Sequence, residues 1–200
     1  MHDELNIGKI AVIGAGTMGN GIAQASAVSG FDTILIDVEF SLLEKALSII
    51  KSNMNRQIKK GNLTNGDKDL SLSRIKLSTE FSSVSACDLV IEAATEKEEV
   101  KLKIFNKLDK MCHKNAILAS NTSSISINKI ALSTKRANKV LGMHFMNPVP
   151  IMKLVEIIRG LDTDEDTIST IIGVSKKMNK IPIQCNDAPG FISNRILMPM

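Results

Sequence analysis

The stretch that decides the fold is Lys9-Ile10-Ala11-Val12-Ile13-Gly14-Ala15-Gly16-Thr17-Met18-Gly19. Its first five residues form a short apolar run, which predicts a buried strand. The small and apolar residues from Thr17 to Ser29 predict a helix, closed by Gly30 as a C-cap. A second apolar run, residues 33–36, predicts another strand and ends at Asp37. Strand, helix and strand within about 30 residues form a βαβ unit.

The three glycines of this stretch fit the dinucleotide-binding pattern Gly-x-Gly-x-x-Gly. The context agrees, because the pattern follows a predicted strand, opens a predicted helix and precedes an acidic residue at the end of the next strand. The first glycine allows a tight turn, the second lets the backbone approach a pyrophosphate, and the third permits close packing of helix on strand. We therefore predict that the phosphates lie at the helix N-terminus, with cofactor contacts from Gly14, Ala15, Gly16, Thr17, Met18 and Gly19. A glycine turn that holds no ligand is the alternative.

The nature of the dinucleotide depends on Asp37. Its carboxylate can accept hydrogen bonds from ribose hydroxyls and would repel a 2′-phosphate. No Arg follows it in Val38-Glu39-Phe40. The sequence therefore favours NAD over NADP.

Alternation of strands and helices continues along the chain. Further strands are predicted at residues 88–92, 116–119, 140–144 and 154–158 and around Ile183, and further helices at 40–60, 98–110 and 164–179. This order predicts an α/β fold, a doubly wound and mostly parallel sheet of the Rossmann type with helices on both faces. Two local features add detail: Asn65-Gly66-Asp67 reads as a turn, and Thr163 with Asp166 resembles a capping box.

Composition excludes several functional classes. The 200 residues are 44% apolar and 23% charged, which is ordinary for a globular protein with a core. The net charge of +4 is modest and the basic residues are scattered, so a nucleic-acid-binding surface is not expected. Cys87, Cys112 and Cys185 lie far apart and predict neither a disulfide framework nor a metal site. The N-terminus does not resemble a signal peptide, and no apolar stretch approaches the ~20 residues of a membrane span. We expect a cytoplasmic protein without membrane contacts.

A histidine and a glutamate are predicted to face each other across two strands. His144 ends one strand, Glu156 lies in the next, and Pro148-Val149-Pro150 separates them. If the chain folds back about Pro150, residues whose numbers sum to 300 are paired, and 144 and 156 satisfy this condition. An imidazole beside a carboxylate is the arrangement of a general acid–base catalyst and its orienting group. The alternative for a lone histidine is a structural role, and we expect that His2 and His113 are surface residues.

Four further segments, together with the glycine pattern, identify a resemblance to a known family. They are residues 91–96 (IEAATE), 120–124 (SNTSS), 142–150 (GMHFMNPVP) and 189–195 (PGFISNR). With these motifs in this order, the chain resembles the 3-hydroxyacyl-CoA dehydrogenases from Lys9 to Met200, most closely the bacterial 3-hydroxybutyryl-CoA type. The resemblance implies an acyl-CoA substrate and NAD as cofactor, with no metal.

The resemblance also implies roles for individual residues. His144 takes the proton of the 3-hydroxyl and Glu156 orients it, while Ser123 and Asn194 act beside them on the substrate oxygens. Ser123, Glu96, Lys101 and Asn147 match positions that line the NAD site. Alternatives remain for most of them: Glu96 and Lys101 could be solvated charges, Ser123 could cap the following turn, and Asn194 could cap or brace its own helix.

The resemblance extends to the CoA tail and to domain organisation. It implies CoA contacts on the helix 40–60, where Arg56 and Lys60 share one face; cations that only complement the helix C-terminus are the alternative. We predict an NAD-binding domain at residues 1–187, and a linker with the start of a truncated helical C-terminal domain at 188–200. In the family that domain completes the site and forms a homodimer, and we expect that these 200 residues do not include it.

Two other classes of protein compete with this interpretation. One is a dehydrogenase of similar architecture that acts on a hydroxy acid or a nucleotide sugar, although those families lack the His-Phe-x-Asn-Pro segment twelve residues before such a glutamate. The other is a module that binds NAD or acyl-CoA without turnover. Mixing the chain with NADH and acetoacetyl-CoA and following absorbance discriminates between turnover and binding.

Overall fold

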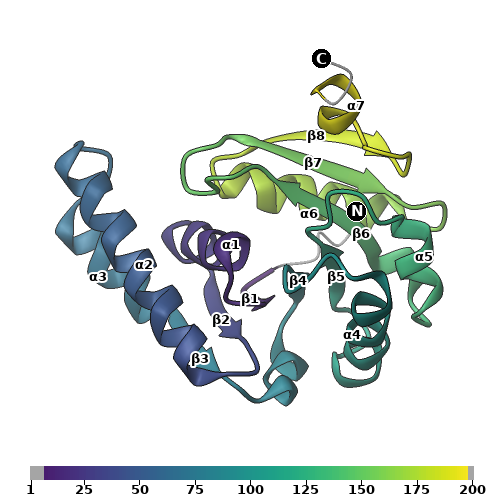
Figure 1. Cartoon of the computed structure of the whole chain (residues 1–200), viewed down its shortest axis with the longest axis horizontal. Coiled ribbons are helices and arrows are strands. Elements are labelled where there is room, and N and C mark those ends of the chain that lie inside the picture. Colours follow the sequence, from purple (N-terminus) through teal and green to yellow (C-terminus); the bar gives the residue numbers. More distant parts are fainter. Residues whose placement is uncertain (1–6, 198–200) are drawn as a thin grey trace.

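The computed structural model describes residues 7–197, which form one sheet with helices on both sides (Figure 1). The predicted surface position of His2 and the last three residues of the predicted second-domain segment lie outside this range. The strands are β1 (Lys9–Ile13), β2 (Asp32–Ile36), β3 (Ile75–Ser78), β4 (Leu89–Glu92), β5 (Ile117–Ser120), β6 (Val140–Phe145), β7 (Leu154–Arg159) and β8 (Ile181–Asn186). The α-helices are α1 (Thr17–Val28), α2 (Phe40–Lys59), α3 (Asn65–Ser73), α4 (Glu98–Met111), α5 (Ile127–Leu132), α6 (Glu165–Lys177) and α7 (Ser193–Leu197).

The strand order β3-β2-β1-β4-β5-β6-β7-β8 is that of a doubly wound sheet. Every neighbouring pair is parallel except β6 and β7, which are antiparallel. The central strands β4, β5 and β6 are buried along their whole length, as expected for strands with both faces covered. The predicted α/β class with a mostly parallel sheet is therefore confirmed.

Alternate side chains of the strands build two separate cores. On one face Val12, Ile91 and Met143 pack with residues of α1, α2 and α6. On the other face Ile13, Val90 and Leu118 pack with residues of α4 and α5. Since successive side chains of a strand point to opposite faces, this division follows from the continuous apolar runs of the sequence.

The sheet has its topological switch point between β1 and β4. The chain winds outward from β1 through β2 to β3, and then returns to the other side of β1 with β4. In open α/β sheets, ligands bind outside the carboxyl ends of the strands at such a point. The glycine-rich turn follows β1 and residues 93–97 follow β4, so both segments lie at this position.

Two local predictions are wrong, and in both cases the residue that caps a helix was not expected from the sequence. Asn65-Gly66-Asp67 is the first turn of α3, because Thr64 and Asp67 form a reciprocal capping box. Thr163 does not cap α6, because its hydroxyl donates to the Val140 carbonyl. Asp164 is the N-cap instead, and its carboxylate accepts the Thr167 N–H at 2.7 Å.

The sequence also left several short elements unpredicted, among them β3 and α5. Strand β3 has four residues that are half-buried or exposed, and α5 has six residues. Such short segments carry too little periodicity to be recognised. Within residues 7–197, no helix combines the length and the apolar character needed to cross a membrane.

Candidate active site

The glycine-rich turn has the shape that a dinucleotide phosphate requires. Gly14 has a φ of +99°, and a β-carbon there would lie 2.6 Å from the Ala94 Cα. A β-carbon on Gly19 would lie 1.7 Å from the Gly14 carbonyl oxygen, so α1 can touch the turn only because Gly19 lacks a side chain. A β-carbon on Gly16, in contrast, would meet no other atom within 4 Å. Helix α1 begins directly after Gly16 without a side-chain cap. Two glycines therefore close the turn, and the third leaves the N-terminus of α1 accessible to an anion.

Asp37 lies beside this turn, as its predicted role requires. One carboxylate oxygen accepts the Ala15 N–H at 2.6 Å, and the other accepts the Val38 N–H at 2.7 Å. Each oxygen of a carboxylate can accept a second hydrogen bond. Asp37 can therefore hold the turn in place and still accept hydrogen bonds from a ribose.

This geometry predicts a loss of cofactor binding in Asp37→Ala. Hydrogen bonds to a charged group contribute about 1.5–3 kcal/mol, so we expect the Kd for NAD to rise roughly tenfold to a hundredfold. Discrimination against NADP should fall as well, because the repelling charge is lost. Titration of each cofactor against the folded variant measures both effects, with the exposed Glu39→Ala as control. Tighter binding of NADP than of NAD by the unmutated chain would contradict the prediction.

The predicted pair of His144 and Glu156 is present. The two residues are direct partners in the antiparallel register of β6 and β7. Leu141 and Arg159, whose numbers also sum to 300, are partners as well. The Nδ1 of His144 lies 2.6 Å from Oε2 of Glu156, and both side chains are buried. Because an ionised carboxylate has no hydrogen to donate, Nδ1 carries the proton. The other ring nitrogen, Nε2, is then left to exchange a proton with a substrate.

The second oxygen of Glu156 binds the segment that follows β8. Oε1 accepts the N–H groups of Ile192 at 3.0 Å and of Ser193 at 2.7 Å. Burial by itself would raise the pKa of Glu156, but the hydrogen bonds from His144, Ser193 and Ile192 outweigh it and lower the pKa below its usual value. Glu156 is thus held ionised, and it connects β6, β7 and the beginning of α7. Phe191 adds a tilted ring contact to His144, with centroids 5.9 Å apart.

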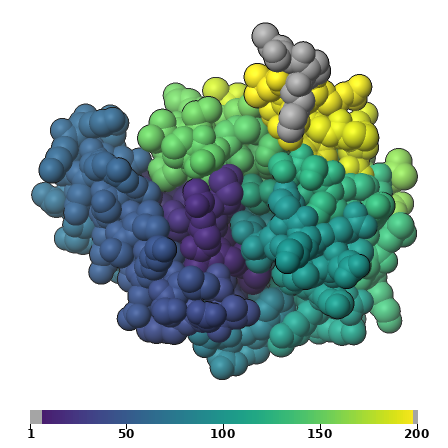
Figure 2. Space-filling view, in the orientation of Figure 1, coloured from purple at the N-terminus to yellow at the C-terminus, as the bar shows by residue number. Residues whose placement is uncertain are grey.

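A cavity of about 410 Å³ extends from His144 of the dyad to Met18 of the nucleotide turn. Figure 2 shows this face of the molecule, where the purple N-terminal segment is recessed between the green and teal segments. The lining residues come from five regions of the chain: Met18, Ala93, Ala94, Thr95, Glu96, Lys101, Asn121, Ser123, His144, Phe145, Met146, Asn147 and Asn194. Of the predicted site residues, the cavity is lined by Met18, Glu96, Lys101, Ser123, His144, Asn147 and Asn194. Glu156, Asp37, the other residues of the glycine-rich turn and the two residues of α2 do not line it.

Comparison with known proteins assigns the family. Residues 9–188 match the family model described as 3-hydroxyacyl-CoA dehydrogenase, NAD binding domain. The chain belongs to this family. Its cofactor is therefore NAD, as the glycine pattern and Asp37 predict. Hydroxy-acid and nucleotide-sugar dehydrogenases, the alternative enzyme classes, are set aside by this match.

Individual relatives agree with the family match. The chain is 44% identical to a probable 3-hydroxybutyryl-CoA dehydrogenase of Deinococcus radiodurans, covering 96% of this chain and 69% of the relative. It is 47% identical to a 3-hydroxybutyryl-CoA dehydrogenase of Bradyrhizobium diazoefficiens, with coverage of 97% and 66%. The crystal structure of (S)-3-hydroxybutyryl-CoA dehydrogenase from Ralstonia eutropha superposes with a TM-score of 0.95 at 48% identity, over 98% of this chain and 69% of that one. The chain thus spans about two thirds of these relatives.

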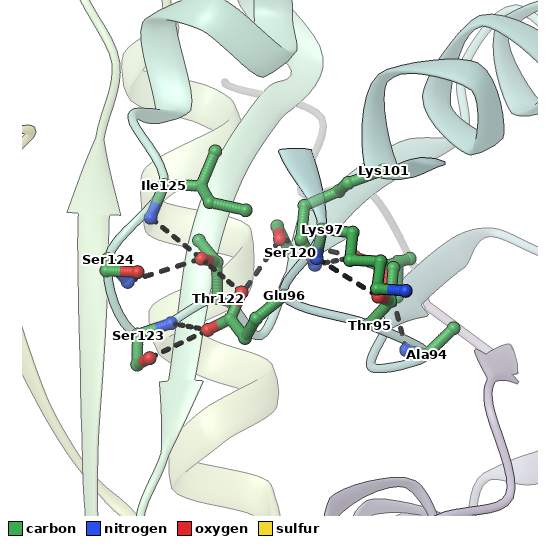
Figure 3. Close-up of polar contacts among 11 residues, drawn as sticks. Ala94, Thr95, Glu96, Lys97, Lys101, Ser120, Thr122, Ser123, Ser124 and Ile125 are labelled. Atoms are coloured by element: carbon green, nitrogen blue, oxygen red, sulfur yellow. Dashed lines mark hydrogen bonds and ion pairs between the residues drawn. The ribbon is translucent and has the colours of Figure 1, made fainter. Parts of the chain in front are cut away.

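In this 3-hydroxyacyl-CoA dehydrogenase domain, Glu96 organises the loop after β5 (Figure 3). Its carboxylate accepts the backbone N–H of Ser123 at 2.5 Å, the Ser123 hydroxyl at 2.7 Å and the Thr122 hydroxyl at 2.8 Å. Burial opposes ionisation of Glu96, but these hydrogen bonds prevail and lower its pKa. Although the residue is exposed, the alternative of a merely solvated charge is wrong, because it is bonded to Ser123.

Two alternatives for the substrate-side residues can also be rejected. The cap of the turn after β5 is Thr122, whose hydroxyl oxygen accepts the N–H groups of Ser124 and Ile125. Ser123 does not serve as this cap. Asn194 does not cap its own helix but donates from Nδ2 to the Ser123 carbonyl oxygen at 3.0 Å. Ser123 and Asn194, which are far apart in sequence, therefore lie together at the cavity.

Lys101 is not the solvated charge that the sequence allowed. Only 1% of it is exposed, and its Nζ is paired with Oε2 of Glu92, which is fully buried. Oε1 of Glu92 accepts the Ala94 N–H at 2.9 Å, and the Ser120 hydroxyl donates to Oε2 at 3.4 Å. Sequence reasoning assigned no role to Glu92, Thr122 or Phe191. The position of Glu92 at the carboxyl end of a central strand was the available signal.

The predicted CoA contacts lie apart from this cavity. Arg56 and Lys60 are exposed near the C-terminal end of α2, and the Arg56 guanidinium donates to the Asn53 side chain. Neither residue is among those that line the cavity. Their role in substrate binding stays a prediction.

Proposed function

We propose that this chain carries the cofactor-binding and catalytic part of an enzyme that interconverts (S)-3-hydroxyacyl-CoA and 3-oxoacyl-CoA, with 3-hydroxybutyryl-CoA as the preferred substrate. The observation that carries the proposal is His144, which is bonded to the buried Glu156 and lines the same cavity as Met18 of the nucleotide turn. The names of the bacterial relatives support the choice of substrate. An enzyme of this kind belongs to fatty acid or butyrate metabolism, and we expect it in the cytoplasm and as a homodimer at full length.

The proposed chemistry is a proton transfer coupled to a hydride transfer. In oxidation, Nε2 of His144 removes the proton of the 3-hydroxyl while the hydride leaves C3, so that the C–O bond becomes a carbonyl. NAD, when bound, supplies the acceptor for that hydride. Glu156 stays ionised, fixes the ring and stabilises the imidazolium that forms. In reduction, His144 returns the same proton to the oxygen.

The remaining residues of the cavity bind and orient the substrate and the cofactor. We propose that Ser123 and Asn194 hold the 3-oxygen of the substrate beside His144. Their existing bonds, Ser123 to Glu96 and Asn194 to the Ser123 carbonyl, support this role because they fix both side chains before substrate arrives. Such positioning of reactants can lower a barrier by about 7–11 kcal/mol at most. Glu96, Lys101 and Asn147 are assigned to the cofactor side of the same cavity.

The test is an assay with NADH and acetoacetyl-CoA, followed by the loss of absorbance of NADH. It is run on the chain as it is and on the chain extended with the C-terminal third of the Deinococcus relative, which supplies the part of that protein that this chain does not match. Formation of (S)-3-hydroxybutyryl-CoA supports the proposal. Binding of NADH without oxidation by either protein would favour the alternative, a binding module without turnover.

The same assay tests the proposed contact with CoA. Replacing Arg56 and Lys60 together by Ala should raise the KM for acetoacetyl-CoA severalfold with a smaller change in kcat, because a contact to the tail contributes equally to substrate and transition state. The matched control replaces Lys45 and Lys51, exposed cations of the same helix, by Ala. The measurement is made at low salt, where such contacts are least screened. An unchanged KM would mean that both cations only complement the C-terminus of α2 and do not contact CoA.

A further inference from the structure

The connection between β6 and β7 forms one wall of the cavity. It begins directly after the dyad strand, and its Asn147 lines the cavity beside His144. A tight turn follows, in which the N–H groups of Ile151 and Met152 both donate to the Pro148 carbonyl at 3.0 Å. We call residues 147–152 the wall turn. Its position decides where Asn147 stands relative to the cofactor.

A buried lysine holds the wall turn from behind. Lys180 lies between α6 and β8, and only 8% of it is exposed. Its ammonium donates to the carbonyl oxygens of Val149 and, at 2.9 Å, of Met152. Within residues 7–197, no carboxylate lies within ion-pair distance of this ammonium. Two backbone carbonyls of one turn therefore replace its hydration.

The opposite side of the wall turn rests on the nucleotide helix. Val149 is 2% exposed, and a β-carbon on Gly21 of α1 would lie 2.8 Å from its Cβ. The turn is thus held between the lysine and α1, the helix whose N-terminus faces the cofactor phosphates. Any movement of the turn would change the distance between Asn147 and the nucleotide turn.

A lysine is a costly residue to place here for packing alone. Burial disfavours the charged ammonium, and it lowers the pKa of Lys180. An apolar side chain of similar length, such as Met, would fill the same space without that cost, but it would leave the carbonyls of Val149 and Met152 without these donors. What the lysine adds over an apolar residue is the fixed position of these two carbonyls.

We propose that Lys180 is a positioning residue for the cofactor site: it holds the wall turn against α1 and so sets the place of Asn147 at the cavity. The inference rests on the proposed function, because it takes Asn147 as a contact of NAD. The lysine acts through the turn and does not itself line the cavity.

The test measures NADH binding by fluorescence in Lys180→Met, Asn147→Ala and the double variant, after circular dichroism has shown that each is folded. The control is Lys176→Met, the same change at an exposed position of α6. We expect Lys180→Met to raise the Kd about tenfold, the size of effect that a lost hydrogen bond to a charged group produces. The double variant should bind no more weakly than the weaker single variant, because residues that act through one contact are not additive.

Several outcomes overturn the inference. The first is a folded Lys180→Met variant whose Kd for NADH equals that of the unmutated chain. The second is a double variant in which the effects of Lys180→Met and Asn147→Ala on the free energy of binding add fully. A lysine with a purely structural role would give either result. If Lys180→Met does not fold, Lys180→Arg is used, which keeps the charge and the donors. In that variant we compare two quantities, the hydrogen-exchange rate of the Ile151 and Met152 amides and the Kd for NADH. Both should change, or both should stay the same. A change in only one overturns the inference. Failure of the unmutated chain to bind NADH would overturn the proposed function and this inference with it.

Discussion

His144→Gln should lose about 10²–10⁴-fold in kcat, the contribution that a general acid–base group typically makes. Glutamine can occupy the space of the imidazole, but it cannot take up the proton of the 3-hydroxyl at neutral pH. His144 is 9% exposed and its side chain contacts Glu156 and Phe191, so the change leaves the glycine-rich turn untouched. The Kd for NADH should therefore stay within a few-fold of its original value.

Three measurements separate this prediction from a loss of folding. Steady-state kinetics in the form of the protein that turns over gives kcat, fluorescence gives the Kd for NADH, and thermal unfolding reports integrity. The control is His113→Gln, because His113 is an exposed histidine whose Nε2 lies 3.7 Å from Oδ1 of Asp88, and it does not line the cavity. Glu156→Gln should also lose rate, since the orienting charge is gone while one oxygen can still accept a hydrogen bond. Near-normal turnover in His144→Gln would end the assignment of the proton transfer.

The central site was predictable because its parts depend on local sequence. The glycine-rich turn and Asp37 lie within one βαβ unit, whose spacing is fixed by the length of a strand and a helix. His144 and Glu156 lie on consecutive antiparallel strands, so their pairing depends only on where the chain folds back. In both cases the residues that meet are separated by a short, regular stretch, and arithmetic on residue numbers was sufficient.

The polar network around that site was not predictable, for a physical reason. Glu96 and Lys101 stand in a charged run that reads as a solvated helix face, and only the packing of α4 on the sheet buries the lysine. The partners of Glu96, Thr122 and Ser123, come from the next strand–helix connection. Lys180 and the wall turn are likewise brought together by the parallel pairing of β7 and β8. Contacts between separate elements depend on side-chain orientation, which periodicity does not specify.

The pair of Glu92 and Lys101 should respond to mutation through stability. Both side chains are buried at the carboxyl end of β4, and the pair connects β4 with α4. Removing one member of a buried ion pair typically costs about 3–5 kcal/mol, because the remaining charge is left uncompensated. We therefore expect Glu92→Gln to lower the free energy of unfolding by about that amount, which is a large part of the ~5–15 kcal/mol that stabilises a typical domain.

The double variant Glu92→Gln with Lys101→Met decides whether the unpaired charge is the cause. Replacement of a buried pair by uncharged groups of similar size is often neutral, so the double variant should regain most of the stability that Glu92→Gln loses. Urea unfolding of the single and double variants gives the coupling between the two sites. The exposed pair of Glu98 and Lys129, with Nζ and Oε2 3.2 Å apart, provides the control. Glu98→Gln should cost less than about 1 kcal/mol, because water screens an exposed pair. A double variant as unstable as Glu92→Gln would instead place the cost in the bonds that Glu92 makes to Ala94 and Ser120, and the buried lysine would not be its source.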